Sequence, residues 1–200
     1  MLSEETKRNL IENYQKHYQE HGESPMATQQ SQEGQFARFV KLAEIGDLRG
    51  KRVLDLGCGI GDLYPVLQEK FGDFDYTGID IVPEFISHAT ARFPAARFVC
   101  QDILLDPLAE DYDYVLISGI FNNELPEGTE LLKAILRAAF PRTKVALGFN
   151  FISTHVNFRS PGMMYHDPVE VMAFCLREIS PRMQLQHHYF RCDVAVFLYT

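Results

Sequence analysis

Short apolar segments of strand length alternate with longer segments of helical periodicity from residue 51 onward. This alternation constrains the fold most, because strands separated by helices need crossover connections and form a mostly parallel sheet. Two last apolar segments, 182–188 and 192–199, lie close enough in sequence to pair as an antiparallel hairpin. We therefore expect an α/β fold, with a doubly wound, mostly parallel seven-stranded sheet that ends in a C-terminal antiparallel hairpin. The other expected strands are 52–56, 74–79, 97–100, 112–117 and 143–149, and the expected helices between and after them are 61–71, 83–92, 127–139 and 168–179.

Two further helices are expected before this alternating region. Residues 4–20 have an amphipathic pattern that follows Ser3, a good N-cap residue, and residues 33–45 precede Gly46, a typical C-cap. The polar segment between them, 21–31, has loop composition. A chain of 200 residues is of ordinary single-domain size. We expect one domain, in which residues 1–48 form a helical lid on a core of residues 49–200.

The charge distribution argues against several classes of partner. The chain has 19 basic and 27 acidic residues, a formal net charge of −8, and no basic run longer than two residues. Nucleic-acid binding normally requires a basic patch, so no nucleic-acid partner is expected. The apolar runs are too short to span a bilayer, and the first residues lack the apolar region of a secretory signal. We expect a cytoplasmic protein with no membrane partner, and we leave its oligomeric state open.

A glycine-rich turn follows the first expected strand. The segment VLDLGCGIGDLY places Gly57, Gly59 and Gly61 where the strand gives way to a helix. Ligands of doubly wound sheets bind at such carboxyl ends of strands. The dinucleotide fingerprint G-x-G-x-x-G fails in both frames, because Asp62 or Tyr64 stands in place of the third glycine. Asp62 would also repel a pyrophosphate, and the Gly-Lys-Ser/Thr of a P-loop is absent. The turn therefore favours a ligand whose contact here is uncharged or cationic, and it disfavours a nicotinamide-dependent oxidoreductase.

The segment DLGCGIG resembles the first motif of the class I S-adenosylmethionine-dependent methyltransferases, D/E-x-G-x-G-x-G, with Asp55 as the acid. Three later positions follow the same family pattern over residues 50–150. Asp80 ends the second strand, Asp102 follows the third, and Ser118 ends the fourth. The resemblance implies that Asp80 accepts hydrogen bonds from both ribose hydroxyls, which suits a two-oxygen acceptor. It implies that Asp102 meets the adenine amino group and that Ser118 lies near the site of methyl transfer.

The resemblance also implies a Rossmann-like core and S-adenosyl-L-methionine as the cofactor. In the lid, Arg38 could pair in bidentate fashion with the methionyl carboxylate, or it could be an ordinary solvent-facing helix residue. Asp80 and Asp102 could instead cap the local turns that follow them, and Asp80 could do both. The expected cofactor-binding residues are Arg38, Asp55, Gly57, Gly59, Gly61, Asp80, Ile81, Asp102, Ile103 and Ser118.

Acceptor contacts are expected from the lid and from two loops, 119–128 and 149–168. Families that methylate the amino groups of adenine, cytosine or glutamine carry D/N-P-P-Y/F after the fourth strand. This chain has Ser-Gly-Ile-Phe at 118–121, which argues against those activities. The expected substrate-binding residues are Tyr14, Tyr18, Phe121, Asn122, Asn150 and Tyr165.

Methyl transfer from a sulfonium needs alignment and exclusion of water, and it needs a base only when the acceptor must lose a proton. Histidine is the side chain best suited to accept a proton near neutral pH. His155 and His166, in the loop 149–168, are therefore the candidate catalytic bases, although either could be a surface or packing residue. The carboxylates do not group convincingly into a Mg²⁺ site, so no metal is expected.

These observations predict methyl transfer to a small-molecule acceptor, with oxygen slightly favoured over nitrogen, because no second substrate-binding domain is present. Two alternatives stay open. The acceptor could be a peptide or protein, which the acidic surface would suit. The chain could also be a non-enzymatic module that binds S-adenosylmethionine.

Overall fold

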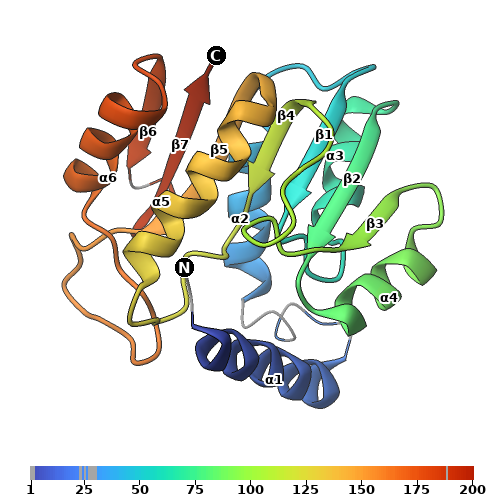
Figure 1. Cartoon of the computed structure of the whole chain (residues 1–200), viewed down its shortest axis with the longest axis horizontal. Helices are drawn as coiled ribbons and strands as arrows, with labels where there is room; N and C mark the ends of the chain where they lie inside the picture. The colour runs from blue at the N-terminus through green and yellow to red at the C-terminus, as the bar shows by residue number, and fades with distance from the viewer. Residues whose placement is uncertain (1–2, 23, 25, 27–30, 188) are drawn as a thin grey trace.

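A computed structural model describes residues 3–22, 24, 26, 31–187 and 189–200, and it contains a seven-stranded sheet with the order β3-β2-β1-β4-β5-β7-β6 (Figure 1). The strands from β1 to β5 pair in parallel, whereas β7 runs antiparallel to both β5 and β6. This confirms the predicted doubly wound sheet and its C-terminal hairpin. The strands are β1 Arg52–Leu56, β2 Asp75–Asp80, β3 Arg97–Cys100, β4 Tyr112–Ile117, β5 Thr143–Ile152, β6 Met183–His187 and β7 Asp193–Tyr199.

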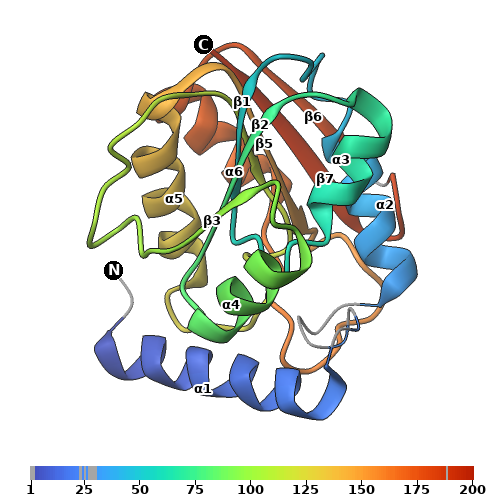
Figure 2. The ribbon, with the colours of Figure 1, turned by 90° about the vertical axis from the view of Figure 1, so that its right-hand side faces the viewer.

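Helices cover both faces of the sheet, and one helix lies across its edge. In Figures 1 and 2, α2 and α3 lie on one face, α5 and α6 lie on the other, and α1 crosses below the ends of the strands. Several of these helices are capped by a polar residue, whose side chain accepts a hydrogen bond from a backbone amide of the first turn. Ser3 accepts from the Thr6 amide in front of α1, and Ser31 does so from Gly34 in front of α2. The helices are α1 Glu4–His21, α2 Gln32–Leu42, α3 Leu63–Phe71, α4 Pro83–Arg92, α5 Gly128–Ala139 and α6 Pro168–Phe174.

The core consists of two apolar layers, one on each face of the sheet. Successive side chains of a strand point to opposite faces, so Val53 of β1 joins the layer under α2 and α3, whereas Leu54 joins the layer under α5 and α6. Phe39 and Leu67 close the first layer, and Phe174 packs in the second. Because both faces are covered, the central strands read as nearly continuous apolar runs.

Several element boundaries differ from those expected. The second helix ends at Leu42 with Ala43 as its C-cap, not at Gly46. Gly46 is needed for packing instead, because a Cβ there would lie 2.6 Å from the Tyr114 hydroxyl oxygen. Strand β5 continues to Ile152, where it still pairs with β7, so the long loop after it is shorter than expected.

The remaining expectations about segments have mixed outcomes. The helix expected over 168–179 is α-helical only to Phe174, and a π-helical turn, Cys175–Ile179, completes it. Most of the loop expected over 21–31, and the last residue of the segment 182–188, fall outside the described residues. Within the part of the chain that the structure covers, no helix combines the length and the apolar character needed to cross a bilayer.

Candidate active site

A cleft of about 170 Å³ opens at the carboxyl ends of the strands, and residues of α1 contribute to its lining. Figure 1 shows that α1 crosses below these strand ends. The ends of β1, β2 and β4 meet there because parallel strands deliver their carboxyl ends to one edge of the sheet. From α1, Glu4, Lys7, Leu10 and Tyr14 reach the cleft. The predicted residues that line it are Tyr14, Asp55, Gly57, Gly59, Asp80, Ile81, Asp102, Ile103 and Ser118.

The glycine turn brings bare backbone to the floor of the cleft. The backbone φ angles of Gly57, Gly59 and Gly61 are 78°, 54° and 82°, which lie in a region that residues other than glycine rarely adopt. A Cβ on Gly57 would lie 2.1 Å from Cγ2 of Ile120, so this position also needs glycine for packing. Gly61 does not line the cleft. A Cβ there would press on the rings of Phe93 and Phe98 at 3.1 Å, so glycine at this position lets the turn pack closely against the end of α4 and β3.

Asp80 sits between the glycine turn and the start of α4. Its Oδ2 accepts a hydrogen bond from the Gly59 amide at 2.9 Å, and its Oδ1 accepts one from the Val82 amide at 3.0 Å. Burial raises the pKa of this carboxyl. Each oxygen keeps a second lone pair, so the carboxylate can receive two more donors from a ligand in the cleft. The local turn contact and the predicted ribose contact are therefore compatible.

Asp55 supplies a second carboxylate, at the end of β1. Its Oδ2 accepts from the Tyr76 hydroxyl at 2.6 Å, and its Oδ1 has no hydrogen-bond partner within the described chain. The side chain is 1% exposed, and this burial raises its pKa to about 7. An unpaired buried oxygen that borders a cleft is costly unless a ligand satisfies it. A cationic ligand group would do so and would lower the pKa.

Asp102 lines the cleft but is already engaged. Its Oδ2 lies 2.6 Å from Nζ of Lys7 in the lid, and its Oδ1 accepts from the Leu104 amide at 3.0 Å. The carboxylate thus joins α1 to the end of β3. Contact with an adenine amino group would have to be shared with Lys7, a residue that the sequence motifs did not indicate.

Tyr14 is the predicted substrate contact that reaches the cleft. The side-chain amide of Asn123 donates a hydrogen bond to its hydroxyl, and burial raises the pKa of Tyr14 to about 12. Asn123 and Ile120 also line the cleft, although neither was predicted. Tyr18 does not line the cleft, although its ring also packs edge-on against Phe85, at a centroid distance of 5.8 Å.

The predicted contacts Phe121, Asn122 and Asn150 lie behind the cleft, not in it. Asn150 is fully buried; its Oδ1 accepts from the Gly119 amide at 2.9 Å, and its Nδ2 donates to Ser118 at 3.3 Å. It therefore shapes the end of β4. Phe121 packs edge-on against Phe149 in the core. The Asn122 backbone carbonyl accepts a hydrogen bond from a backbone amide of the loop after β5. All three residues are buried and none lines the cleft, so their contact with a substrate stays a prediction.

Arg38 does not face the cleft either. Its guanidinium lies 3.2 Å from the Asp193 carboxylate, and both side chains are more than nine-tenths buried. The pair joins α2 to the first residue of β7, far from the glycine turn in sequence. The guanidinium is thus engaged in an intramolecular ion pair, and its bond to a methionyl carboxylate stays a prediction.

Neither predicted histidine reaches the cleft. His166 is 2% exposed, donates from Nε2 to the Phe121 carbonyl at 3.0 Å, and borders a separate cavity between α5 and α6 together with Tyr165. Burial lowers the pKa of His166, so it is neutral at pH 7. His155 is exposed, with its ring 6.1 Å from that of His187. None of His155, His166 and Tyr165 lines the cleft, and their expected roles in catalysis and substrate binding stay predictions.

Comparisons with known proteins agree with this arrangement. The profile of a family described as "Methyltransferase domain" matches residues 53–142. A protein of Mycobacterium tuberculosis that is named as a methyltransferase is 31% identical over 144 residues, which cover 68% of this chain and 84% of the relative. The chain belongs to the class I S-adenosylmethionine-dependent methyltransferases. S-adenosylmethionine is the cofactor of this methyltransferase family.

Other relatives of the methyltransferase are more distant or match only in part. Malonyl-[acyl-carrier protein] O-methyltransferase of Acetivibrio thermocellus is 36% identical over 85 residues, which span 40% of this chain and only 30% of that enzyme. The solved DhpI–SAH complex is 16% identical with a TM-score of 0.72, over 98% of this chain and 97% of that one. This last similarity shows the fold.

Proposed function

We propose that this methyltransferase transfers a methyl group from S-adenosylmethionine to an oxygen atom of a small, largely apolar acceptor. The observation that carries the proposal is the cleft itself. It combines the bare backbone of Gly57 and Gly59, the Asp80 carboxylate and the unpaired oxygen of Asp55 at one edge of the sheet. Bound S-adenosylmethionine supplies the activated methyl group.

Three groups of the cofactor have a chemically matched partner in the cleft. Asp80 would accept from the two ribose hydroxyls, which are vicinal donors. The free Oδ1 of Asp55 would accept from the methionyl ammonium, because the pairing of opposite charges satisfies that buried oxygen. Ile81 and Ile103 would provide apolar walls for the adenine ring. The residues present therefore fit the cofactor of the family.

We also propose that residues 1–48 form a lid that closes the cleft. Side chains of α1 contact two loops that follow strands and the first turn of α4. Lys7 meets Asp102 after β3, and Tyr14 meets Asn123 after β4. Gln15 donates to the carboxylate of Glu84 at 2.9 and 3.0 Å. Closure by α1 would keep water away from the reacting atoms, which strengthens the electrostatic interactions that hold the cofactor, and it would hold the acceptor near the methyl group.

The preference for oxygen follows from what lines the cleft. Among the described residues that border it there is no histidine, and Tyr14 is protonated at neutral pH. With the Asp55 and Asp80 carboxylates assigned to the cofactor, we assign no base to the acceptor, so an acceptor that is already ionised, such as a carboxylate or an acidic hydroxyl, is favoured. Side chains such as Leu10, Phe85 and Ile135 make most of the wall apolar. The partly matching O-methyltransferase supports the same choice.

Matched acceptors test this proposal. The protein is incubated with methyl-labelled S-adenosylmethionine and with pairs of apolar compounds that share a carbon skeleton, one a carboxylic acid or phenol and the other an amine. We expect label on the oxygen compounds. Transfer to the amines alone would contradict the oxygen preference, and cofactor binding without transfer to any compound would favour a binding module.

A further inference from the structure

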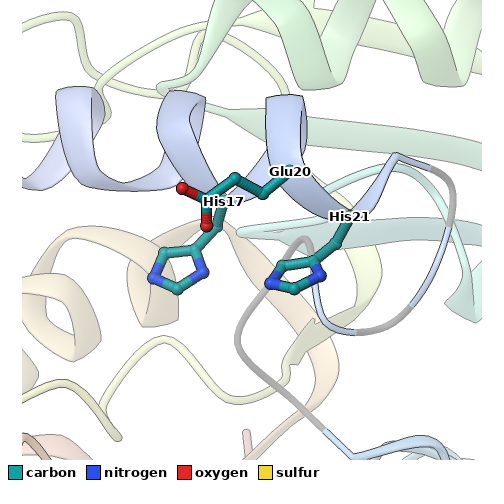
Figure 3. A group of neighbouring side chains, drawn as sticks. All are labelled: His17, Glu20 and His21. Atoms are coloured by element: carbon teal, nitrogen blue, oxygen red, sulfur yellow. The ribbon is translucent and has the colours of Figure 1, made fainter.

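The C-terminal end of α1 carries three potential metal ligands on one face. Glu20 and His21 follow His17 by three and four residues, and this spacing places both of their side chains on the same side of the helix as that of His17. One ligand atom from each residue lies within 4.8 Å of the other two. Figure 3 shows the two imidazole rings side by side, with the Glu20 carboxylate reaching back along the helix toward His17. The cluster is separate from the cleft, which none of these three residues lines.

We propose that His17, Glu20 and His21 bind one zinc-like divalent transition-metal ion. Imidazole nitrogen and carboxylate oxygen are common zinc ligands, and three protein ligands leave a fourth position for water. Ligand atoms about 2.1 Å from a tetrahedral ion are about 3.4 Å from one another. Since the present separations are at most 4.8 Å, closure needs movements of about 1.4 Å or less, within reach of small side-chain rotations.

The surroundings of the cluster favour a cation. Nδ1 of His17 is shielded from solvent and has no hydrogen-bond partner among the described residues, a deficit that ring rotation onto a metal would remove. Glu20 and His21 lie in the last turn of α1, where the helix dipole attracts positive charge. Lys16 is the competitor for Glu20, but their 4.0 Å pair is largely exposed and therefore weak.

The position of the cluster gives the ion a structural role. No residue of α1, which is described along its whole length, is fully buried, so side-chain contacts hold the helix in place. A metal that joins two successive turns would oppose fraying of the end of α1, because it binds only the helical arrangement. The ion would thereby stabilise the helix that borders the cleft, without taking part in methyl transfer.

Calorimetry with zinc chloride on the full-length, tag-free protein tests the proposal. We expect one zinc per chain. Loss of an outer-shell partner alone costs about 10–100-fold in metal affinity, so His17→Ala and His21→Ala should each weaken binding by at least about tenfold. Glu20→Gln should also weaken it. The control Lys16→Ala, on the same helix, should bind zinc as tightly as the wild type or more tightly. Mg²⁺ should not bind, because it requires oxygen ligands.

Two results would overturn the metal site. One is an absence of zinc binding at about 100 µM, a concentration far above that needed for a three-ligand site. The other is unchanged affinity in both histidine variants. Imidazole resonances of the wild type give a second reading that needs no variant. Zinc should shift the signals of His17 and His21 and leave that of His155 in place, whereas the reverse pattern would assign the metal elsewhere and refute the proposal.

Discussion

At the scale of single residues, the cleft depends on two carboxylates that differ in how they are satisfied. Asp80 receives backbone amides on both oxygens, whereas Asp55 keeps one oxygen buried and unpaired. The unpaired oxygen makes the charged form of Asp55 unfavourable in the free protein. A ligand cation would reverse that cost. Binding and protonation are therefore coupled at Asp55.

Asp55→Asn tests whether the pKa of Asp55 is raised in the ligand-free protein. The folded pKa of Asp55 is raised to about 7, above the roughly 3.9 of an unfolded chain. Its contribution to stability is thus full below about pH 4 and is lost as the pH rises toward 7. Between pH 5 and pH 8 we expect the wild type to lose on the order of 2 kcal/mol of unfolding free energy relative to Asp55→Asn. Urea unfolding at both pH values measures this, and parallel profiles would contradict it.

The two histidines of the loop after β5 should differ in a stability measurement. His166→Ala leaves the buried Phe121 carbonyl without its donor, so the free energy of unfolding should fall by about 1–3 kcal/mol. His155 is exposed, and His155→Ala should change the free energy of unfolding by less than about 0.5 kcal/mol. Equal losses in the two variants, measured by urea unfolding at pH 7, would contradict the packing role of His166.

At the scale of elements, α1 is attached to the core by side chains and not by a buried apolar face. The Lys7–Asp102 pair is about one-fifth exposed at each partner, which makes it stronger than a surface pair. Tyr14 and Tyr18 add edge contacts to Phe85. An element held in this way can open locally without unfolding of the sheet.

Lys7→Ala should loosen α1. Loss of an ion pair worth about 1 kcal/mol corresponds to about fivefold faster amide exchange over 4–21. Lys16→Ala removes an exposed lysine of the same helix and is the matched control, with little change expected. Hydrogen–deuterium exchange measures both. Equal exchange in the wild type and the Lys7 variant would show that this ion pair does not hold α1.

At the scale of the whole molecule, the sequence predicts what depends on local pattern and fails where distant segments meet. The strand–helix alternation and the glycine turn were sufficient for the sheet and the cleft floor, because each is encoded within a few neighbouring residues. The pairing of Arg38 with Asp193, 155 residues apart, left no local signal. The same is true of Asn123 and Tyr14. The cytoplasmic location and the absence of nucleic-acid and membrane partners stay predictions.

Titration of S-adenosylhomocysteine into wild type and Asp80→Asn is the most direct test of the proposed cofactor site. Loss of charge at Asp80 should weaken two hydrogen bonds worth about 1.5 kcal/mol or more each, and so lower affinity about 100-fold. Asp75→Asn, at the exposed start of the same strand, should bind as the wild type does. Equal dissociation constants for the wild type and Asp80→Asn would contradict the placement of the ribose at Asp80.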